Sequence, residues 1–187
     1  MAIKTFTTGE VLTASDTNTY LANSGLVYVT SYAVGSTNVG SVIIPNAFNS
    51  TYDNYRVIWS GGSMSAASAT MQFQLRTGSS TSTTGYYYGM TGTTFAGAST
   101  MAGGSNDSRV IYGGGGDSGV WGHFDAEFFS PYQAIYTKFW CDYLYGAGAA
   151  RTTGVHAVAT SYDQLVLTPF SGTMVNGTIT VYGYRKQ

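Results

Sequence analysis

The sequence has 187 residues, a formal net charge of −1 and only 9% charged residues, compared with about 25% in an average soluble domain. It has no cluster of Lys and Arg, which a nucleic-acid groove requires, so we expect no nucleic acid as a partner. The start lacks an apolar signal-peptide core, and no apolar run approaches the ~20 residues that cross a bilayer. We therefore expect the chain to fold in a cytosol, without membrane insertion.

The low charge content restricts how the surface is solvated. Either uncharged polar residues replace charges there, or other subunits cover much of the surface. The chain has 16 tyrosines, and aromatic residues are enriched at subunit interfaces whose centres are depleted of charge. We therefore expect a homo-oligomer. The single cysteine, Cys141, excludes an internal disulfide framework.

The first 24 residues differ from the rest of the chain. Thr13 and Asp16 fit a capping box, which predicts a helix of about two turns over Ala14–Asn23. The apolar side chains in and beside this segment are Leu12, Tyr20 and Leu21. A helix this short is marginal alone in water, so we expect it to dock on a partner; a frayed terminus is the alternative.

From Leu26 onward the pattern is that of β-strands. The expected strands are Leu26–Tyr32, Val39–Ile44, Tyr55–Ser60, Ala69–Thr77, Gly119–Phe129, Ala134–Leu144, Gly154–Thr160, Gln164–Thr168 and Gly177–Tyr184. Alternation places Met71, Phe73 and Leu75 on one face of their strand. Strands separated by turn residues, without long helical patterns between them, favour an all-β sandwich or barrel.

Two glycine-rich stretches interrupt this pattern. Gly78–Gly104 contains a run of three tyrosines, so we expect ordered loops or short strands there, with a disordered linker as the alternative. Gly113–Gly116 lacks the Lys-Ser/Thr of a phosphate loop, and we expect a flexible loop tip. Gly119–Phe129 and Ala134–Leu144 are expected to pair as a hairpin, with Lys138 meeting an acid of the first strand.

The sharpest candidate for chemistry is the series His123, Asp125 and Glu127, which share one face of a strand. Same-face neighbours lie about 7 Å apart, so one cation rarely takes all three, and we favour a polar outer or subunit-facing strand face. His156 has no carboxylate near it in the sequence. We expect no catalytic residue, no metal and no cofactor.

Several aromatic residues exceed what one small core needs. They are Tyr86, Tyr87, Tyr88, Trp121 and Trp140. Tyr and Trp offer rigid contact area and stack on sugars as well as on partner subunits. We interpret them as subunit contacts first and glycan contacts second.

The N-terminal phrase FTTGEVLTASDTNTYL, from Phe6 to Leu21, resembles the short N-terminal segment of many tailed-bacteriophage virion proteins. In those proteins the phrase F-x-x-G-x-V-L-T-A-x-x-x-N-x-Y-L precedes fibre or appendage domains. Phe48–Val57 and the closing stretch from Ser171 to Lys186 also resemble segments of that group, whereas Gly78–Tyr145 does not.

The resemblance implies an oligomer, often a trimer, in which a small N-terminal segment docks onto the particle. Residues 1–24 would be that docking segment, and residues 25–187 would form a β-sandwich head, of jelly-roll type. By the resemblance, the docking residues are Phe6, Val11, Leu12, Asp16, Asn18, Tyr20 and Leu21. A host-recognition surface would lie in the exposed loops of the head.

Three functions remain open at this point. The first is a non-enzymatic phage structural protein located in the virion and assembled in the host cytoplasm. It would be a tail fibre or tail-associated appendage that contacts tail or baseplate proteins and a host surface glycan. The second is a capsid decoration, or head fibre, protein that cements capsomers. The third is a carbohydrate-binding or carbohydrate-cleaving β-protein, of which we disfavour the cleaving version because of the chain's size.

Overall fold

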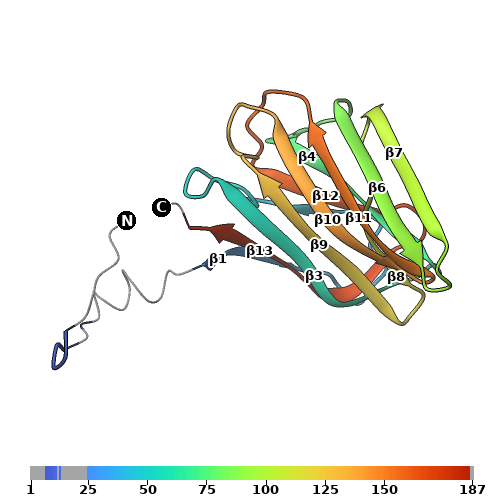
Figure 1. Cartoon of the computed structure of the whole chain (residues 1–187), viewed down its shortest axis with the longest axis horizontal. Helices are drawn as coiled ribbons and strands as arrows, with labels where there is room; N and C mark the ends of the chain where they lie inside the picture. The colour runs from blue at the N-terminus through green and yellow to red at the C-terminus, as the bar shows by residue number, and fades with distance from the viewer. Residues whose placement is uncertain (1–6, 12, 14–24, 186–187) are drawn as a thin grey trace.

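The computed structural model describes residues 7–11, 13 and 25–185. These residues form an all-β structure with no helix among them, as the sequence predicts (Figure 1). The strands are β1 (Leu26–Ala33), β2 (Val42–Ile44), β3 (Asn54–Met64), β4 (Ala69–Thr77), β5 (Ser80–Thr81), β6 (Tyr86–Thr94), β7 (Ser99–Asp107), β8 (Val110–Asp117), β9 (Trp121–Phe129), β10 (Thr137–Tyr145), β11 (Gly148–His156), β12 (Gln164–Pro169) and β13 (Met174–Tyr184).

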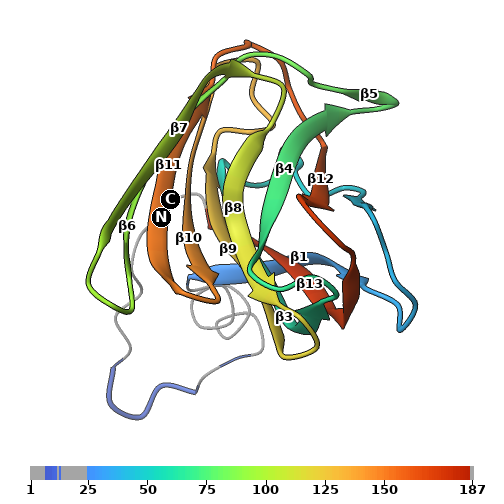
Figure 2. The ribbon, with the colours of Figure 1, turned by 90° about the vertical axis from the view of Figure 1, so that its right-hand side faces the viewer.

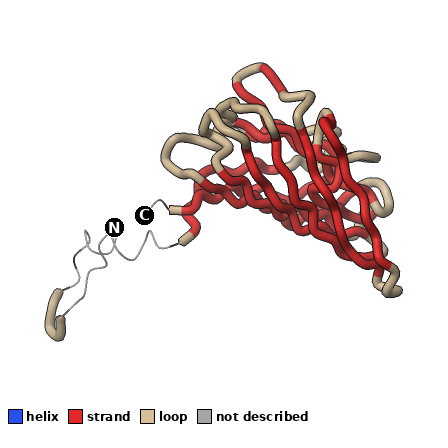
Figure 3. The backbone as a smooth tube through the Cα atoms, turned by 45° about the horizontal axis from the view of Figure 1, so that its top comes forward, coloured by secondary structure: helices blue, strands red, loops and turns tan. Residues whose placement is uncertain are grey.

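Antiparallel hydrogen bonding joins these strands into one sheet that folds back over itself. The main layer has the order β1-β13-β3-β9-β10-β11-β6-β7, and the short layer has the order β2-β12-β4-β8, with β5 on β4. Figure 2 shows β4 and β12 on one side of the molecule and β11, β6 and β7 on the other. Loops join the strands at the ends of both layers (Figure 3).

The core fills the space between the two layers. Phe73 of β4 lies at its centre, with edge-to-face ring contacts at 5.0 Å to Phe139, 5.2 Å to Phe128 and 6.1 Å to Phe124. The predicted inward positions of β4, Met71 and Leu75, are buried with it. Strand alternation in the sequence therefore assigned the faces of β4 correctly, because side chains of a strand alternate between its two faces.

β8 links the two layers through three of its four glycines. Gly114–Gly116 pair with β4 on one side and with β9 on the other. A flexible loop tip was expected at Gly113–Gly116, and that expectation is wrong: the run is buried inside a strand. A Cβ on Gly115 would collide with the carbonyl oxygen of Leu144 in β10. Backbones approach so closely here that only glycine fits.

The β9–β10 hairpin forms as predicted, but its register differs from the expected one. Lys138 lies opposite Phe129, not opposite an acid. Trp140 lies opposite Glu127 instead. The length of the connecting loop sets this pairing, and the sequence pattern does not specify it.

The remaining expectations are confirmed in part. Of the strand expected over Gly154–Thr160, only Gly154–His156 is in a strand, as the end of β11. Gly78–Gly104 is ordered, since it holds β5, β6 and part of β7. The strand expected over Val39–Ile44 is shorter, because Val39 makes only an isolated bridge to Met174. The helix expected over Ala14–Asn23 lies outside the described residues.

The two ends of the head lie side by side. β1 pairs antiparallel with β13, and Leu26 lies opposite Tyr184. The backbone N–H of Arg185 donates to the carbonyl of Gly25 at 3.3 Å. Gly25 and Arg185 therefore lie side by side at one end of the β1–β13 pair.

Candidate functional site

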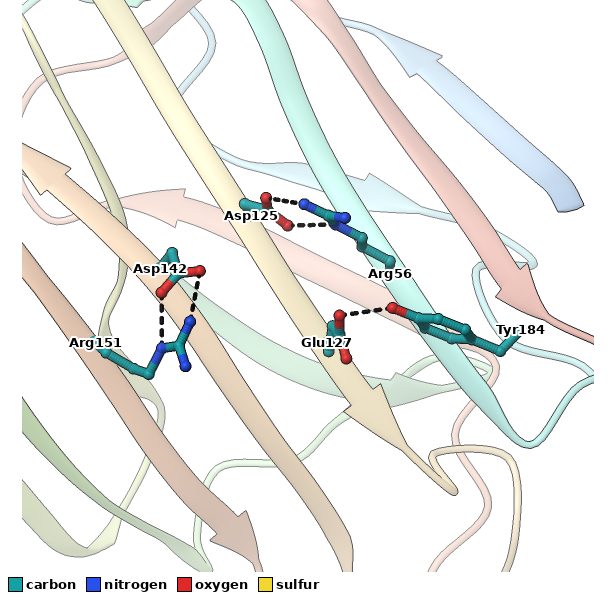
Figure 4. A network of polar contacts seen from close by, with 6 residues as sticks. All are labelled: Arg56, Asp125, Glu127, Asp142, Arg151 and Tyr184. Carbon is teal, nitrogen blue, oxygen red and sulfur yellow. Dashed lines mark hydrogen bonds and ion pairs between the residues drawn. The ribbon is translucent and has the colours of Figure 1, made fainter. Parts of the chain in front are cut away.

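The surface of the main layer that points away from the short layer collects much of the chain's charge. We call it the outer face. Its side chains alternate with the buried positions of β3, β9, β10, β11 and β13. It includes Arg56, His123, Asp125, Glu127, Phe129, Lys138, Trp140, Asp142, Arg151, Tyr182 and Tyr184. Figure 4 shows the polar contacts at its centre.

A two-pronged ion pair joins β3 to β9. Nε of Arg56 donates to one carboxylate oxygen of Asp125 at 2.9 Å, and Nη2 donates to the other at 2.5 Å. The Arg56 side chain is 36% exposed and that of Asp125 is 19% exposed. This hydrogen bonding raises the pKa of Arg56 above its ordinary value. Parallel N–H···O bonds of this kind fix geometry as well as charge.

A second ion pair joins β10 to β11. Arg151 donates to the two carboxylate oxygens of Asp142 at 2.8 Å and 3.0 Å, and these bonds lower the pKa of Asp142. Asp142 lies directly opposite Asp125 in the sheet. Each of these facing carboxylates is thus balanced by an arginine from the strand on its far side, which removes the repulsion expected between like charges.

Glu127 is held by a tyrosine. The Tyr184 hydroxyl donates to its carboxylate at 2.6 Å, and burial together with this bond raises the pKa of Tyr184 to about 12. His123, Asp125 and Glu127 share the outer face, but two of the three are bound to other side chains. Within the described residues no group of three His, Cys, Asp or Glu side chains is placed to hold a metal ion. The geometry thus favours a polar contact surface over an ion site.

The aromatic residues predicted to make contacts divide between the two faces. Tyr87 and Trp140 point outward and are 41% and 39% exposed, and Trp121 is half-buried at the start of β9. Tyr86 and Tyr88 are buried between the layers, so their expected place on a contact surface is wrong. A run of three residues in a strand must divide between its faces, and that signal was present in the sequence.

Outward aromatic rings lie on both flanks of the charged centre. Trp140 packs edge-to-face against Phe129, with ring centroids 4.6 Å apart. Tyr28 of β1 is 61% exposed and lies opposite Tyr182 of β13. The outer face therefore combines internally neutralised charges with flat aromatic side chains, a composition suited to contacts with another surface.

Sequence reasoning missed the partners Arg56, Arg151 and Tyr184. Alternation in the sequence places Arg56 on the outward side of its strand, between Tyr55 and Val57. It does not show that β3 pairs with β9, so the contact with Asp125 had no signal in the sequence.

Removing Arg56 while keeping its size is expected to destabilise the fold. Arg56→Met leaves Asp125 facing Asp142 without its counter-charge, so we expect the free energy of unfolding to fall by about 1 kcal/mol in urea titrations. Adding Asp125→Asn should restore most of that loss, because the facing charge is then gone. Arg151→Met is the matched variant at a more exposed pair and should lose less. Equal losses in both variants would contradict this account.

His156 is the one buried histidine of the described chain. Its Nε2 donates to the carbonyl of Thr84 at 3.0 Å and is hydrogen-bonded to the Ser82 hydroxyl at 2.8 Å, whereas its buried Nδ1 has no hydrogen-bond partner among the described residues. Its ring packs on Tyr86 with centroids 4.3 Å apart. Burial lowers the pKa of His156, and the bond to Thr84 opposes this in part. Its role is therefore structural, as a neutral ring in the core.

The depressed pKa of His156 makes the stability of the fold dependent on pH. The unfolded chain, in which histidine titrates near about 6.5, binds a proton that the folded chain resists. The free energy of unfolding should therefore fall as pH is lowered from about 7 toward the folded-state pKa. Urea titrations across this range should show a flatter profile for His156→Gln. An unchanged slope in His156→Gln would contradict the assignment.

Of the predicted docking residues, Val11 is the only one within the described part of the chain, and it is 79% exposed. The other six lie outside it.

No helix in the described ranges is long and apolar enough to span a membrane.

The sequence matches no protein-family model and no curated protein.

Proposed function

We propose that the chain is a non-enzymatic structural protein of a bacteriophage particle, a tail fibre or tail-associated appendage. Residues 1–24 dock onto the particle, and residues 25–187 form the head that is presented outward. The motifs that resemble phage virion proteins motivate this assignment, as do the low charge and the aromatic surface.

The observation that carries the proposal is the position of the two ends of the head. Gly25 and Arg185 are hydrogen-bonded to each other beside the β1–β13 pair. An N-terminal docking segment thus leaves the head from one corner. The other loops and the outer face are then free to point away from the particle, as an attachment protein requires.

We further propose that the head is a jelly roll. The first strand of the set pairs with the last, β2 with β12. Inside this pair lies β3 with β9, then β4 with β8, and innermost β6 with β7. Nested pairing of this kind is the strand order of a wound-up hairpin, which is how a jelly roll is built. The β10–β11 hairpin would be an insertion between β9 and β6.

The same proposal makes the protein a homo-oligomer, a trimer by analogy with the proteins it resembles. Uncharged polar groups and exposed rings such as Tyr28, Tyr87 and Trp140 favour subunit contact, because charge is depleted at interface centres.

Deleting residues 2–24 tests the docking assignment. We expect a head that keeps its β-type circular dichroism and its cooperative melt but is absent from purified particles. A full-length Phe95→Ala chain is the matched control, because that ring is 74% exposed on the head, and it should be incorporated normally. Incorporation of the shortened chain would overturn the docking role.

A second candidate, capsid decoration, is favoured by the broad outer face, whose charges are neutralised internally and which can therefore be buried at low cost. The copy number per particle separates the two candidates. Quantitative mass spectrometry against the major capsid protein should give few copies for a tail fibre. A number close to that of the capsid subunits would replace the fibre assignment by decoration.

A further inference from the structure

We propose that a hollow on the outside of the short layer binds a neutral sugar ring of a glycan. The hollow has a volume of about 520 Å³, within the usual range of small-ligand sites. It is lined by Gln72, Asp107, Ser108, Arg109, Ile111 and Phe170. These residues come from β4, the end of β7, the β7–β8 turn, β8 and the segment after β12. The hollow is separate from the outer face and contains none of the aromatic residues assigned to contacts from the sequence.

Two irregularities in the strands converge on this hollow. In β8, three residues from Ile111 to Gly113 stand opposite Gln72 alone. In β7, the register shifts just before Asp107, where Asn106 has a φ of 58°, a conformation uncommon outside glycine. Bulges of this kind re-aim side chains and are frequent next to functional sites. Here they lie on both sides of the turn that carries Ser108 and Arg109.

The carboxylate of Asp107 is held in place from within the core. The buried Tyr88 hydroxyl donates to it at 2.9 Å. Burial and this bond raise the pKa of Tyr88, so the hydroxyl keeps its proton as a donor. Gly104 provides the space, because a Cβ there would collide with the Asp107 carboxylate. The second carboxylate oxygen is left to accept a hydrogen bond from a ligand.

Donors stand beside that acceptor. Gln72 is only 6% exposed, yet it borders the hollow, and its carbonyl oxygen accepts a bond of 3.2 Å from Nη1 of Arg109. No described residue accepts a hydrogen bond from the Gln72 amide nitrogen, and no described carboxylate lies within ion-pair distance of Arg109. A buried amide and a guanidinium with spare N–H groups are thus aimed at one site.

Phe170 supplies an apolar surface at the rim of the hollow. Phe170 is 64% exposed, so much of its ring is open to solvent. A sugar ring presents hydroxyls that both donate and accept on its edge, and C–H groups on its face. The hydroxyls can form hydrogen bonds with Asp107, Gln72 and Arg109, and the C–H face can stack on the ring of Phe170. The opposite charges of Asp107 and Arg109 cancel, so the hollow favours a neutral sugar over a charged one.

This inference adds to the proposed attachment role, since a glycan is a component of host surfaces, but it does not depend on it. Sugar binding is a property of the isolated chain, whereas docking is a property of the particle. The removal of residues 2–24 leaves all the residues of the hollow in place, so either proposal can fail without the other.

Saturation-transfer NMR on the full chain tests the hollow, with glucose, galactose, mannose and N-acetylglucosamine as probes. We expect at least one to bind with a Kd of about 1–10 mM. In a spectrum of the ¹⁵N-labelled chain, the same sugar should shift the side-chain amide of Gln72. Phe170→Ala should weaken binding about five- to tenfold. Phe95→Ala, which removes a ring of similar exposure elsewhere on the head, should leave binding unchanged.

Three results would overturn the proposal. The first is the absence of saturation transfer from all four sugars. The second is binding that Phe170→Ala leaves intact or that Phe95→Ala weakens equally. The third is binding of glucuronate without binding of any neutral sugar. Because Phe170 is largely exposed, its variant should melt at the parent temperature, so lost binding would not reflect lost folding.

Discussion

Replacing Phe73 by alanine is expected to lower the free energy of unfolding by about 3–5 kcal/mol. The ring is buried in the middle of the core, and it meets four other aromatic rings edge-to-face, one of them Tyr86 at 6.5 Å. Strands of both layers surround the site and limit how far it can collapse, so most of the cavity should remain. Urea unfolding followed by tryptophan fluorescence measures the loss.

Phe95→Ala is the control for this change, because it deletes the same side chain at a position that is 74% exposed. Its free energy of unfolding should stay within about 0.5 kcal/mol of that of the parent. A loss below about 1.5 kcal/mol for Phe73→Ala would mean that the two layers are not held together through this ring.

Adding a single methyl group at Gly115 is expected to destabilise the fold by about 3 kcal/mol, the upper part of the range for overpacking. The new Cβ would collide with the carbonyl oxygen of Leu144 and would lie 2.9 Å from the Tyr143 ring and 3.2 Å from the carbonyl oxygen of Ala69. Two of these three atoms belong to the backbones of paired strands, which cannot move without breaking ladder hydrogen bonds. The measurement is the urea midpoint of Gly115→Ala.

Gly89→Ala is the matched control, since Gly89 also lies inside a strand but has nothing within 4 Å of an added Cβ. That variant should be neutral or slightly more stable, because alanine restricts the unfolded chain more than glycine does. If both variants behaved alike, close backbone approach at the layer junction would not be the reason for the glycine run.

Strand faces could be predicted from the sequence because the period of a strand is local. The alternation in Tyr55, Val57 and Trp59 puts all three on one face of β3, and that face is the buried one. The all-β class followed from the same patterns. The glycine run of β8 was misread because glycine marks both loops and crowded strands, and the crowding comes from β10, which is distant in sequence.

The two surfaces with functional potential could not be assembled from the sequence. The outer face depends on the pairing of β3 with β9, which sets Arg56 beside Asp125. The hollow depends on bulges in β7 and β8, where extra residues shift the strand register. No pattern in the sequence marks those residues as bulged. Tyr88 was predicted as a surface contact, but it faces inward and acts on the surface only through Asp107.

The pairing of β1 with β13 has a consequence for synthesis. The strand that opens the head completes its hydrogen bonding only when the strand that closes the head has been made. β3 likewise pairs on one edge with β13 and on the other with β9, both of which are made after it. Contacts so distant in the chain slow folding. The β1-β13-β3 edge of the main layer must therefore form after residues 174–184 have left the ribosome, and until then β1 and one edge of β3 expose unpaired backbone groups, a feature that promotes aggregation.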